Sequence, residues 1–228
     1  MKDAYPKTFI FVRHAESDGN LLSVEERTRH EVGTNRYALT DRGRRQAELT
    51  GKWLRDRYPE PDRILRSYYE RVHQTSDIVY PDLPKRQENL LAEANRGIWH
   101  VATEEEIRAV LPFEIRRRDL EGYYHYRAPG GENWPDVERR VRDFRRSIRE
   151  NYHGKVIVVF GHGTWELVWR KVLNCWDDTE VMEHYYRQDI VGNASISIYH
   201  GRFDEETGRP YLAHDPLVDY KVPWKDKL

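Results

Sequence analysis

The sequence has little cysteine and no long apolar run. Cys175 is the single cysteine among 228 residues, so no disulfide can form within the chain. This favours a reducing compartment, and we expect the protein in the cytoplasm. No apolar stretch approaches the roughly 18 residues that cross a bilayer. The apolar stretch Phe9–Val12 is also too short for a signal peptide, so we expect no membrane partner.

An excess of one charge sign is lacking too. The net charge is −1, which argues against a nucleic-acid partner. Acidic clusters and the Cys/His spacings of metal sites are also missing, so we expect no metal and no cofactor. Arginine, however, is abundant, with 29 of the 38 basic residues. A bias of the source genome explains most of them, but the planar guanidinium group suits phosphate and carboxylate better than an ammonium group does.

Apolar strands alternate with helical patterns along the chain. Thr8–Val12 and Val156–Phe160 are continuously apolar, as is typical of central strands covered on both faces. Shorter strands are expected at Arg63–Leu65 and Ser195–His200, with an edge strand after the turn near Gly208. Helices are expected at Thr40–Tyr58, Ser67–Tyr80, from Thr103 onward, at Trp134–Tyr152 and at Thr164–Leu173. The alternation predicts an α/β protein with a mostly parallel central sheet, helices on both faces and an edge strand near the C-terminus.

A histidine follows each of the two strongest strands. Arg13-His14 comes directly after the first, and Gly161-His162-Gly163 ends the second. Ligands of open α/β sheets gather beyond the carboxyl ends of the strands. A single histidine after a strand is most often structural, but two of them with basic or glycine neighbours favour a functional site.

Two further residues fit an anion site. Arg71 is expected in the first turn of the helix that Ser67 opens, where free N–H groups and a partial positive charge suit an anion. Glu93 follows an apolar pair in "NLLAEANRGIW". Each also has a plainer interpretation. Arg71 would pair with Glu70 or Glu93 on the surface, and Glu93 would be an exposed loop carboxylate.

Five motifs resemble those of the histidine phosphatase superfamily, in its phosphoglycerate-mutase-like branch: "VRHAESDGN", "SYYERVHQTS", "LLAEANRGIW", "PGGENWPDVERRV" and "VVFGHG". The resemblance extends from Thr8 to Tyr199. It implies a three-layer α/β sandwich with a mixed sheet, in one domain spanning residues 1–228. It also implies the site residues, which are His14 as nucleophile, Glu93 as proton donor, His162 as third catalytic residue, and Arg13, Asn20, Arg71 and Gly163 around the phosphate.

The chemistry of phosphoryl transfer agrees with these roles. Two arginines can give paired hydrogen bonds to the phosphate oxygens. His14 must be neutral to attack phosphorus, with its other nitrogen held by a backbone carbonyl. His162 can donate a hydrogen bond to the phosphoryl group, and Glu93 can protonate the leaving alkoxide and then activate water. Should Glu93 not be the acid, Glu166 and Glu16 are the next candidates.

The expected function is therefore a metal-independent phosphoric monoester hydrolase. It would form a phosphohistidine and act on a small phosphorylated metabolite such as a sugar phosphate. A phosphoglycerate mutase is an alternative, although Gly19 stands where the glycolytic mutases have a tryptophan. A non-catalytic module that binds phosphorylated ligands is a second alternative, against which the intact nucleophile and acid speak. Whether the protein is a monomer or a homodimer stays open.

Residues at about 95–135 are expected to form a lid or specificity insertion. Within it, Tyr123–Arg127 would face the substrate or pack as an aromatic cluster on the rest of the domain. The stretch is similar to the fructose-2,6-bisphosphatase domain. Gly130 stands where that domain has a lysine, and His100 stands where many relatives have the glutamate of a G-x-W-E-G motif.

Overall fold

One mixed sheet forms the centre of the molecule. The computed structural model describes residues 5–228, and in them the sheet has seven strands. Six of these follow the order β3-β2-β4-β1-β5-β6, and the seventh, β7, pairs with β5 outside this order. The strands are β1 (Thr8–Arg13), β2 (Arg63–Arg66), β3 (Arg86–Gln87), β4 (Val156–Gly161), β5 (Ile196–Phe203), β6 (Pro210–Ala213) and β7 (Tyr220–Lys221). Strands β1 to β4 pair in parallel, whereas β5 is antiparallel to β1, β6 and β7. The expected strands are confirmed, and no expectation covered β3 and β7.

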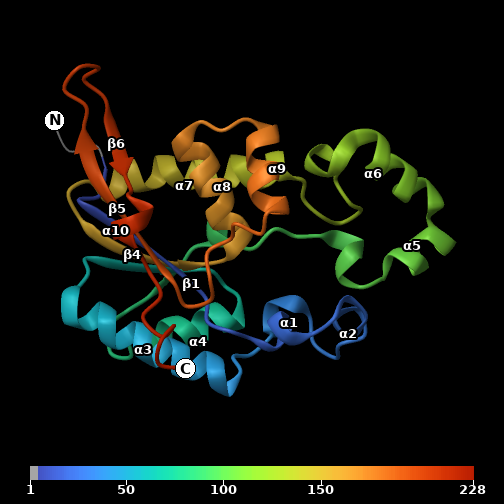
Figure 1. The fold of residues 1–228 in the computed structure, drawn as a ribbon, viewed down its shortest axis with the longest axis horizontal. Helices are drawn as coiled ribbons and strands as arrows, with labels where there is room; N and C mark the ends of the chain where they lie inside the picture. Colours follow the sequence, from blue (N-terminus) through green and yellow to red (C-terminus); the bar gives the residue numbers. More distant parts are fainter. Residues whose placement is uncertain (1–4) are drawn as a thin grey trace.

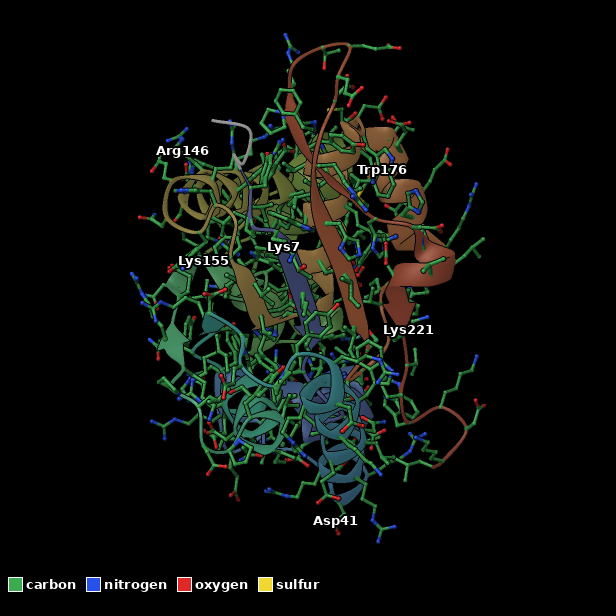
Figure 2. The ribbon with its side chains drawn as sticks, turned by 90° about the vertical axis from the view of Figure 1, so that its left-hand side faces the viewer. Lys7, Asp41, Arg146, Lys155, Trp176 and Lys221 are labelled. Atoms are coloured by element: carbon green, nitrogen blue, oxygen red, sulfur yellow. The ribbon has the colours of Figure 1, made fainter. Side chains whose placement is uncertain are left out.

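Helices cover both faces of the sheet (Figure 1), as expected of a three-layer sandwich. The α-helices are α1 (Asp18–Leu21), α2 (Val24–Thr28), α3 (Asp41–Arg57), α4 (Glu70–Val79), α5 (Glu104–Val110), α6 (Pro112–His125), α7 (Trp134–Asn151), α8 (Gly163–Asn174), α9 (Asp178–Tyr186) and α10 (Pro216–Asp219). Short 3₁₀ turns are η1 (Thr34–Arg36), η2 (Asn89–Leu91) and η3 (Gly97–His100). In the turned view of Figure 2, Arg146 of α7 and Asp41 of α3 lie on opposite sides of the molecule. None of the helices in residues 5–228 is both long and apolar enough to cross a membrane.

Strand β1 contributes to two cores at once. Phe9 and Phe11 point into the core under α7 and α8, where Phe11 stacks on Trp165 with ring centroids 5.6 Å apart. Ile10 and Val12 point to the other face and pack under α3 and α4. Because both faces are covered, the strand has no polar alternation. Each fully buried side chain of this kind contributes roughly 1.5–3 kcal/mol.

Most helix starts agree with the expected caps, but that of α4 does not. Thr40 caps α3 and Thr103 caps α5 through their side chains. Helix α4 begins after Tyr69, so the expected capping box at Ser67 is wrong. The Ser67 hydroxyl instead bonds to the ring of His162 at 2.9 Å. Since both side chains are fully buried, this bond satisfies groups that water cannot reach.

The segment at residues 95–135 carries η3, α5 and α6 and lies beside α9, beyond the helices that cover the sheet (Figure 1). Gly122, with φ of 74°, interrupts α6. The chain after this kink packs through its tyrosines: Tyr123 stacks on Tyr185 of α9 at 5.7 Å, and Tyr124 stacks on Trp134 at 6.2 Å. The interpretation as an aromatic cluster is confirmed. Tyr123 and Tyr126 also line a cavity, and a role of Tyr123–Arg127 in substrate specificity stays a prediction.

Candidate active site

A cavity of about 570 Å³ opens beside the carboxyl end of β1 and the start of α8. Segments α1 and α2 border it on one side and η3 and α6 on the other, and these segments face each other in Figure 1. Six of the seven residues expected from the sequence line it: Arg13, His14, Asn20, Arg71, Glu93 and Gly163. The seventh, His162, is fully buried behind them, with its ring centroid 5.4 Å from that of His14.

His14 has the protonation state that a nucleophile needs. Its Nδ1–H donates to the carbonyl of Ala15 at 2.8 Å, so the lone pair is on Nε2, which has no hydrogen-bond partner in residues 5–228. Burial, followed by the charges of Arg71 and Arg13, lowers the pKa of His14 well below its usual 6.5. The ring is therefore neutral at pH 7, and the carbonyl contact expected from the chemistry is present.

Backbone carbonyls hold the two arginines. Arg13 donates to the carbonyl of Val191, and Arg71 donates to that of Thr34 at 2.8 Å. The Arg13 Nε–H is buried and has no partner in the described chain. Burial lowers the pKa of both guanidinium groups, and the nearby charge of Glu93 opposes this. Arg71 is buried, so its interpretation as a surface residue is wrong. The positive charge of the pair is available to a bound anion.

His162 supports Arg71 from behind. Its Nδ1 accepts a hydrogen bond from Arg71 at 3.2 Å, so the proton is on Nε2, which donates to Ser67. Burial and the charge of Arg71 lower the pKa of His162 well below 6.5. In this arrangement the ring makes no contact with the cavity. A direct hydrogen bond from His162 to a phosphoryl oxygen requires the other tautomer, and it stays a prediction.

Gly163 and Asn20 add uncharged donors. Gly163 is the first residue of α8, where backbone N–H groups suit an anion. A Cβ at this position would lie 2.6 Å from the side chain of Ile190 and 3.3 Å from the Arg13 guanidinium, so glycine allows the close approach. Asn20 lines the cavity, and because its Oδ1 accepts from the backbone of Ser17 at 3.0 Å, the amide Nδ2 group is left as a donor.

Glu93 differs from the two carboxylates considered in its place. Its carboxylate accepts one hydrogen bond, from the next residue's N–H at 2.9 Å, and it has no ion-pair partner in residues 5–228. Glu166 is fully buried and bonds to Arg170 at 3.1 Å, and Glu16 bonds to Arg42 at 2.8 Å. Neither lines the cavity, so both are wrong as reserve acids.

Two residues around His14 were not expected from the sequence. Thr75 accepts a hydrogen bond from the N–H of Ala15 at 3.0 Å and donates to the carbonyl of Arg71 at 2.6 Å. Asn193 donates to the carbonyl of His14 at 3.1 Å. Thr75 lies one helical turn after Arg71, so the helical period could have indicated it. Asn193 comes before β5, and only the antiparallel pairing of β5 with β1 brings it next to His14, so the sequence alone gives no signal for its role.

Arg71→Ala should weaken the binding of phosphate and of vanadate. The change removes a charge-assisted hydrogen bond in a partly desolvated site, and one such bond contributes about 1.5–3 kcal/mol. Inhibition constants for both anions measure the loss. Arg63→Ala is the matched control, because Arg63 is an exposed residue of β2 outside the cavity. Equal affinities in wild type and Arg71→Ala would remove Arg71 from the site.

Stability should fall in acid because of His14. The unfolded chain protonates this histidine near pH 6.5, whereas the folded protein keeps it neutral to a much lower pH. The unfolded state therefore binds the extra proton, and the wild type should lose about 1 kcal/mol relative to His14→Asn between pH 7.5 and 5.5. The difference should level off below the folded-state pKa. Urea unfolding of both proteins tests this, and parallel pH profiles would contradict it.

Fold and site together define a class of protein, namely a three-layer α/β protein with two arginines and a neutral histidine at the carboxyl end of a parallel strand. The family model described as histidine phosphatase superfamily (branch 1) matches residues 9–209, and the chain belongs to this family. Membership of this family confirms the expected enzyme class, a phosphoric monoester hydrolase.

Similar proteins agree with the family. Human 6-phosphofructo-2-kinase/fructose-2,6-bisphosphatase 3 is 30% identical over 136 residues, which are 60% of this chain and 24% of the relative. The match thus spans about a quarter of that relative's length. The solved structure of Bacillus stearothermophilus YhfR has a TM-score of 0.71 and 24% identity, and it covers 95% of this chain and 98% of that one. Phosphoserine phosphatase from Entamoeba histolytica, in complex with 3-phosphoglyceric acid, has a TM-score of 0.65 and 20% identity, with coverages of 90% and 94%. These two structures show the same fold.

Proposed function

We propose that the protein is a metal-independent phosphomonoesterase that forms a phosphohistidine at His14 and acts on a small phosphorylated metabolite such as a sugar phosphate. The state of His14 carries the proposal. The ring is buried and neutral, and its Nδ1–H is held by a carbonyl. The buried Arg71 and the partly buried Arg13 are close enough for their charges to act on it. The names of the relatives, which include a bisphosphatase and a phosphoserine phosphatase, support the reaction type.

The proposed reaction has two steps. Arg13, Arg71 and the N–H of Gly163 bind the phosphate oxygens, and Nε2 of His14 attacks phosphorus. The bond from phosphorus to the ester oxygen breaks, and that oxygen takes a proton from Glu93. In the second step Glu93 takes a proton from water, the water oxygen attacks phosphorus, and the bond from phosphorus to Nε2 breaks. The products are the alcohol and inorganic phosphate, and His14 is neutral again.

The small-molecule ester is the proposed partner, and the cytoplasm is the proposed location. A net charge of −1 gives no reason to add a nucleic acid as a partner. A single cysteine, which is exposed and unpaired, fits a reducing compartment.

Hydrolysis of p-nitrophenyl phosphate in the presence of EDTA tests the proposed function. We expect turnover there and with several members of a panel of phosphorylated metabolites. Absence of turnover on all of them would contradict the proposal. Faster exchange of phosphoryl groups between the 2- and 3-positions of phosphoglycerate than hydrolysis would indicate a mutase. Equal phosphate binding by wild type and His14→Ala, with no activity in either, would indicate a binding module.

A further inference from the structure

The cavity contains two arginines beyond the pair beside the nucleophile. Arg27 of α2 and Arg96, which precedes η3, both line it. In residues 5–228 neither guanidinium has a carboxylate partner. Arg27 donates only to the carbonyl at the start of α2, at 3.3 Å, and the Arg96 side chain makes no hydrogen bond. Arg118, which also lines the cavity, differs because it pairs with Glu104 at 3.1 Å.

The cavity's carboxylates leave positive charge uncompensated. Apart from Glu104, they are Glu132, which pairs with Arg140 at 2.6 Å, and Glu93. Among residues 5–228, four arginines without a carboxylate partner (Arg13, Arg27, Arg71 and Arg96) therefore line the cavity with one carboxylate that has no ion-pair partner. A phosphate dianion and an ionised Glu93 together compensate three of the four positive charges, so one positive charge remains. If Glu93 is protonated, two positive charges remain. The excess suits a second anionic group.

His100 lines the cavity with these outer arginines and adds a neutral donor. Its Nε2 accepts a hydrogen bond from the backbone N–H of Arg96 at 3.0 Å, so the proton of the neutral ring is on Nδ1. Burial, followed by the charges of Arg96 and Arg27, lowers the pKa of His100 to about 4. The glutamate that the sequence motif leads one to expect here would cancel the positive field and repel an anion, whereas a neutral imidazole preserves it.

Glu93 indicates how a substrate would lie. Its charge opposes the lowering of the Arg13 and Arg71 pKa by burial, and after Tyr123 and Tyr185 it also helps to raise the pKa of Arg96. Glu93 also lines the cavity together with all three arginines, so it lies within electrostatic reach of both groups of arginines. If the ester oxygen faces Glu93, the phosphoryl group lies towards the nucleophile and the alcohol part towards Arg96. Tyr123 and Tyr185 also lie near Arg96 and border this end of the cavity.

We propose that Arg27, Arg96 and His100 form a second anion subsite, and that the substrate is a small phosphomonoester with a second anionic group, a carboxylate or a phosphate, on its alcohol part. The inference rests on the proposed function, because the phosphoryl group at His14 decides which end of the substrate reaches the second subsite. A volume of about 570 Å³ suits a small metabolite rather than phosphate alone.

Matched substrates test the subsite. 3-Phosphoglycerate and glycerol 3-phosphate differ in a carboxylate, and fructose 1,6-bisphosphate and fructose 6-phosphate differ in a phosphate. We expect the wild type to prefer the first member of at least one pair in kcat/KM, and the pair that shows the preference identifies the anion. Arg96→Met should reduce that preference roughly 10- to 100-fold, the equivalent of one charge-assisted hydrogen bond. His100→Glu should reduce it as well.

Arg116→Met is the matched control, because Arg116 is an exposed arginine of α6 that lies outside the cavity and has no ion-pair partner in the part of the chain that the structure describes. It should leave the preference unchanged. Thermal melting checks that the variants fold. Turnover of p-nitrophenyl phosphate with no preference within either pair, or a preference that survives in Arg96→Met, would overturn the subsite while the proposed function stands. If no ester is hydrolysed, the proposed function fails, and dissociation constants for the same pairs decide the subsite in the same way.

Discussion

His14→Ala should reduce the hydrolysis of every phosphomonoester to the detection limit. Removal of a covalent nucleophile costs on the order of 10⁶-fold in turnover. In residues 5–228 the other two imidazoles at or near the cavity have no free lone pair, because His162 bonds through both ring nitrogens and Nε2 of His100 accepts from the N–H of Arg96. The fold should survive, since the His14 side chain makes a single hydrogen bond within the described residues, to the carbonyl of its neighbour Ala15 just after β1. Turnover numbers, thermal melting and phosphate affinity together measure this.

The variant should still bind phosphate, because the two arginines are held by carbonyls that the substitution does not touch. His73→Ala is the control, since this partly buried histidine of α4 lies outside the cavity, and its turnover should stay near that of the wild type. Near-normal turnover by a folded His14→Ala protein would mean that another residue is the nucleophile.

Glu93→Gln should separate proton donation from binding. An alkyl phosphate leaves as a strongly basic alkoxide, so loss of the acid should slow its hydrolysis by roughly 10²–10⁴-fold, the usual contribution of general acid catalysis. p-Nitrophenolate is a much weaker base and can leave without a proton from an acid. The rate of p-nitrophenyl phosphate hydrolysis should therefore fall clearly less. The comparison holds when formation of the phosphoenzyme limits the rate, and burst kinetics establish that first.

Glu105→Gln is the control for this experiment, because Glu105 is an exposed carboxylate of α5 outside the cavity. It should hydrolyse both substrates at wild-type rates. Equal losses on both substrates in Glu93→Gln would show that Glu93 is not the leaving-group acid. Glu16 and Glu166 do not line the cavity, so the acid would then have to come from the substrate or from Glu104 or Glu132, which line the cavity although each pairs with an arginine.

Much of the fold could be predicted from local pattern. The apolar runs at β1 and β4 and the strand–helix alternation determine a covered sheet, and His14 and His162 follow from where these strands end. The capping pattern at Ser67 predicted a helix start that the structure does not have. The Ser67 hydroxyl instead bonds to His162, which is far away in the sequence, and a local capping rule cannot predict such a partner. The two-residue strands β3 and β7 exist only through pairing with β2 and β5, so their own residues carry no signal.

The outer part of the site was harder to predict for the same reason. Nothing in the sequence distinguishes Arg96 from the many other arginines. Its significance lies in the fact that it lines the cavity and has no carboxylate partner within residues 5–228. The role of Asn193 likewise depends on the antiparallel pairing of β5 with β1, which brings the start of one strand to the end of the other. Nearest partners across the fold, rather than sequence neighbours, decide these roles.

Trapping of the phosphoenzyme tests the central claim most directly. The protein is mixed with a phosphorylated substrate, quenched in alkali within the burst, digested and analysed by mass spectrometry. The account predicts one added phosphoryl group on the peptide that contains His14, stable in alkali, lost in acid and absent from His14→Ala. A phosphoryl group on any other residue, or full turnover with no phosphorylated peptide at any time in the burst, would contradict it.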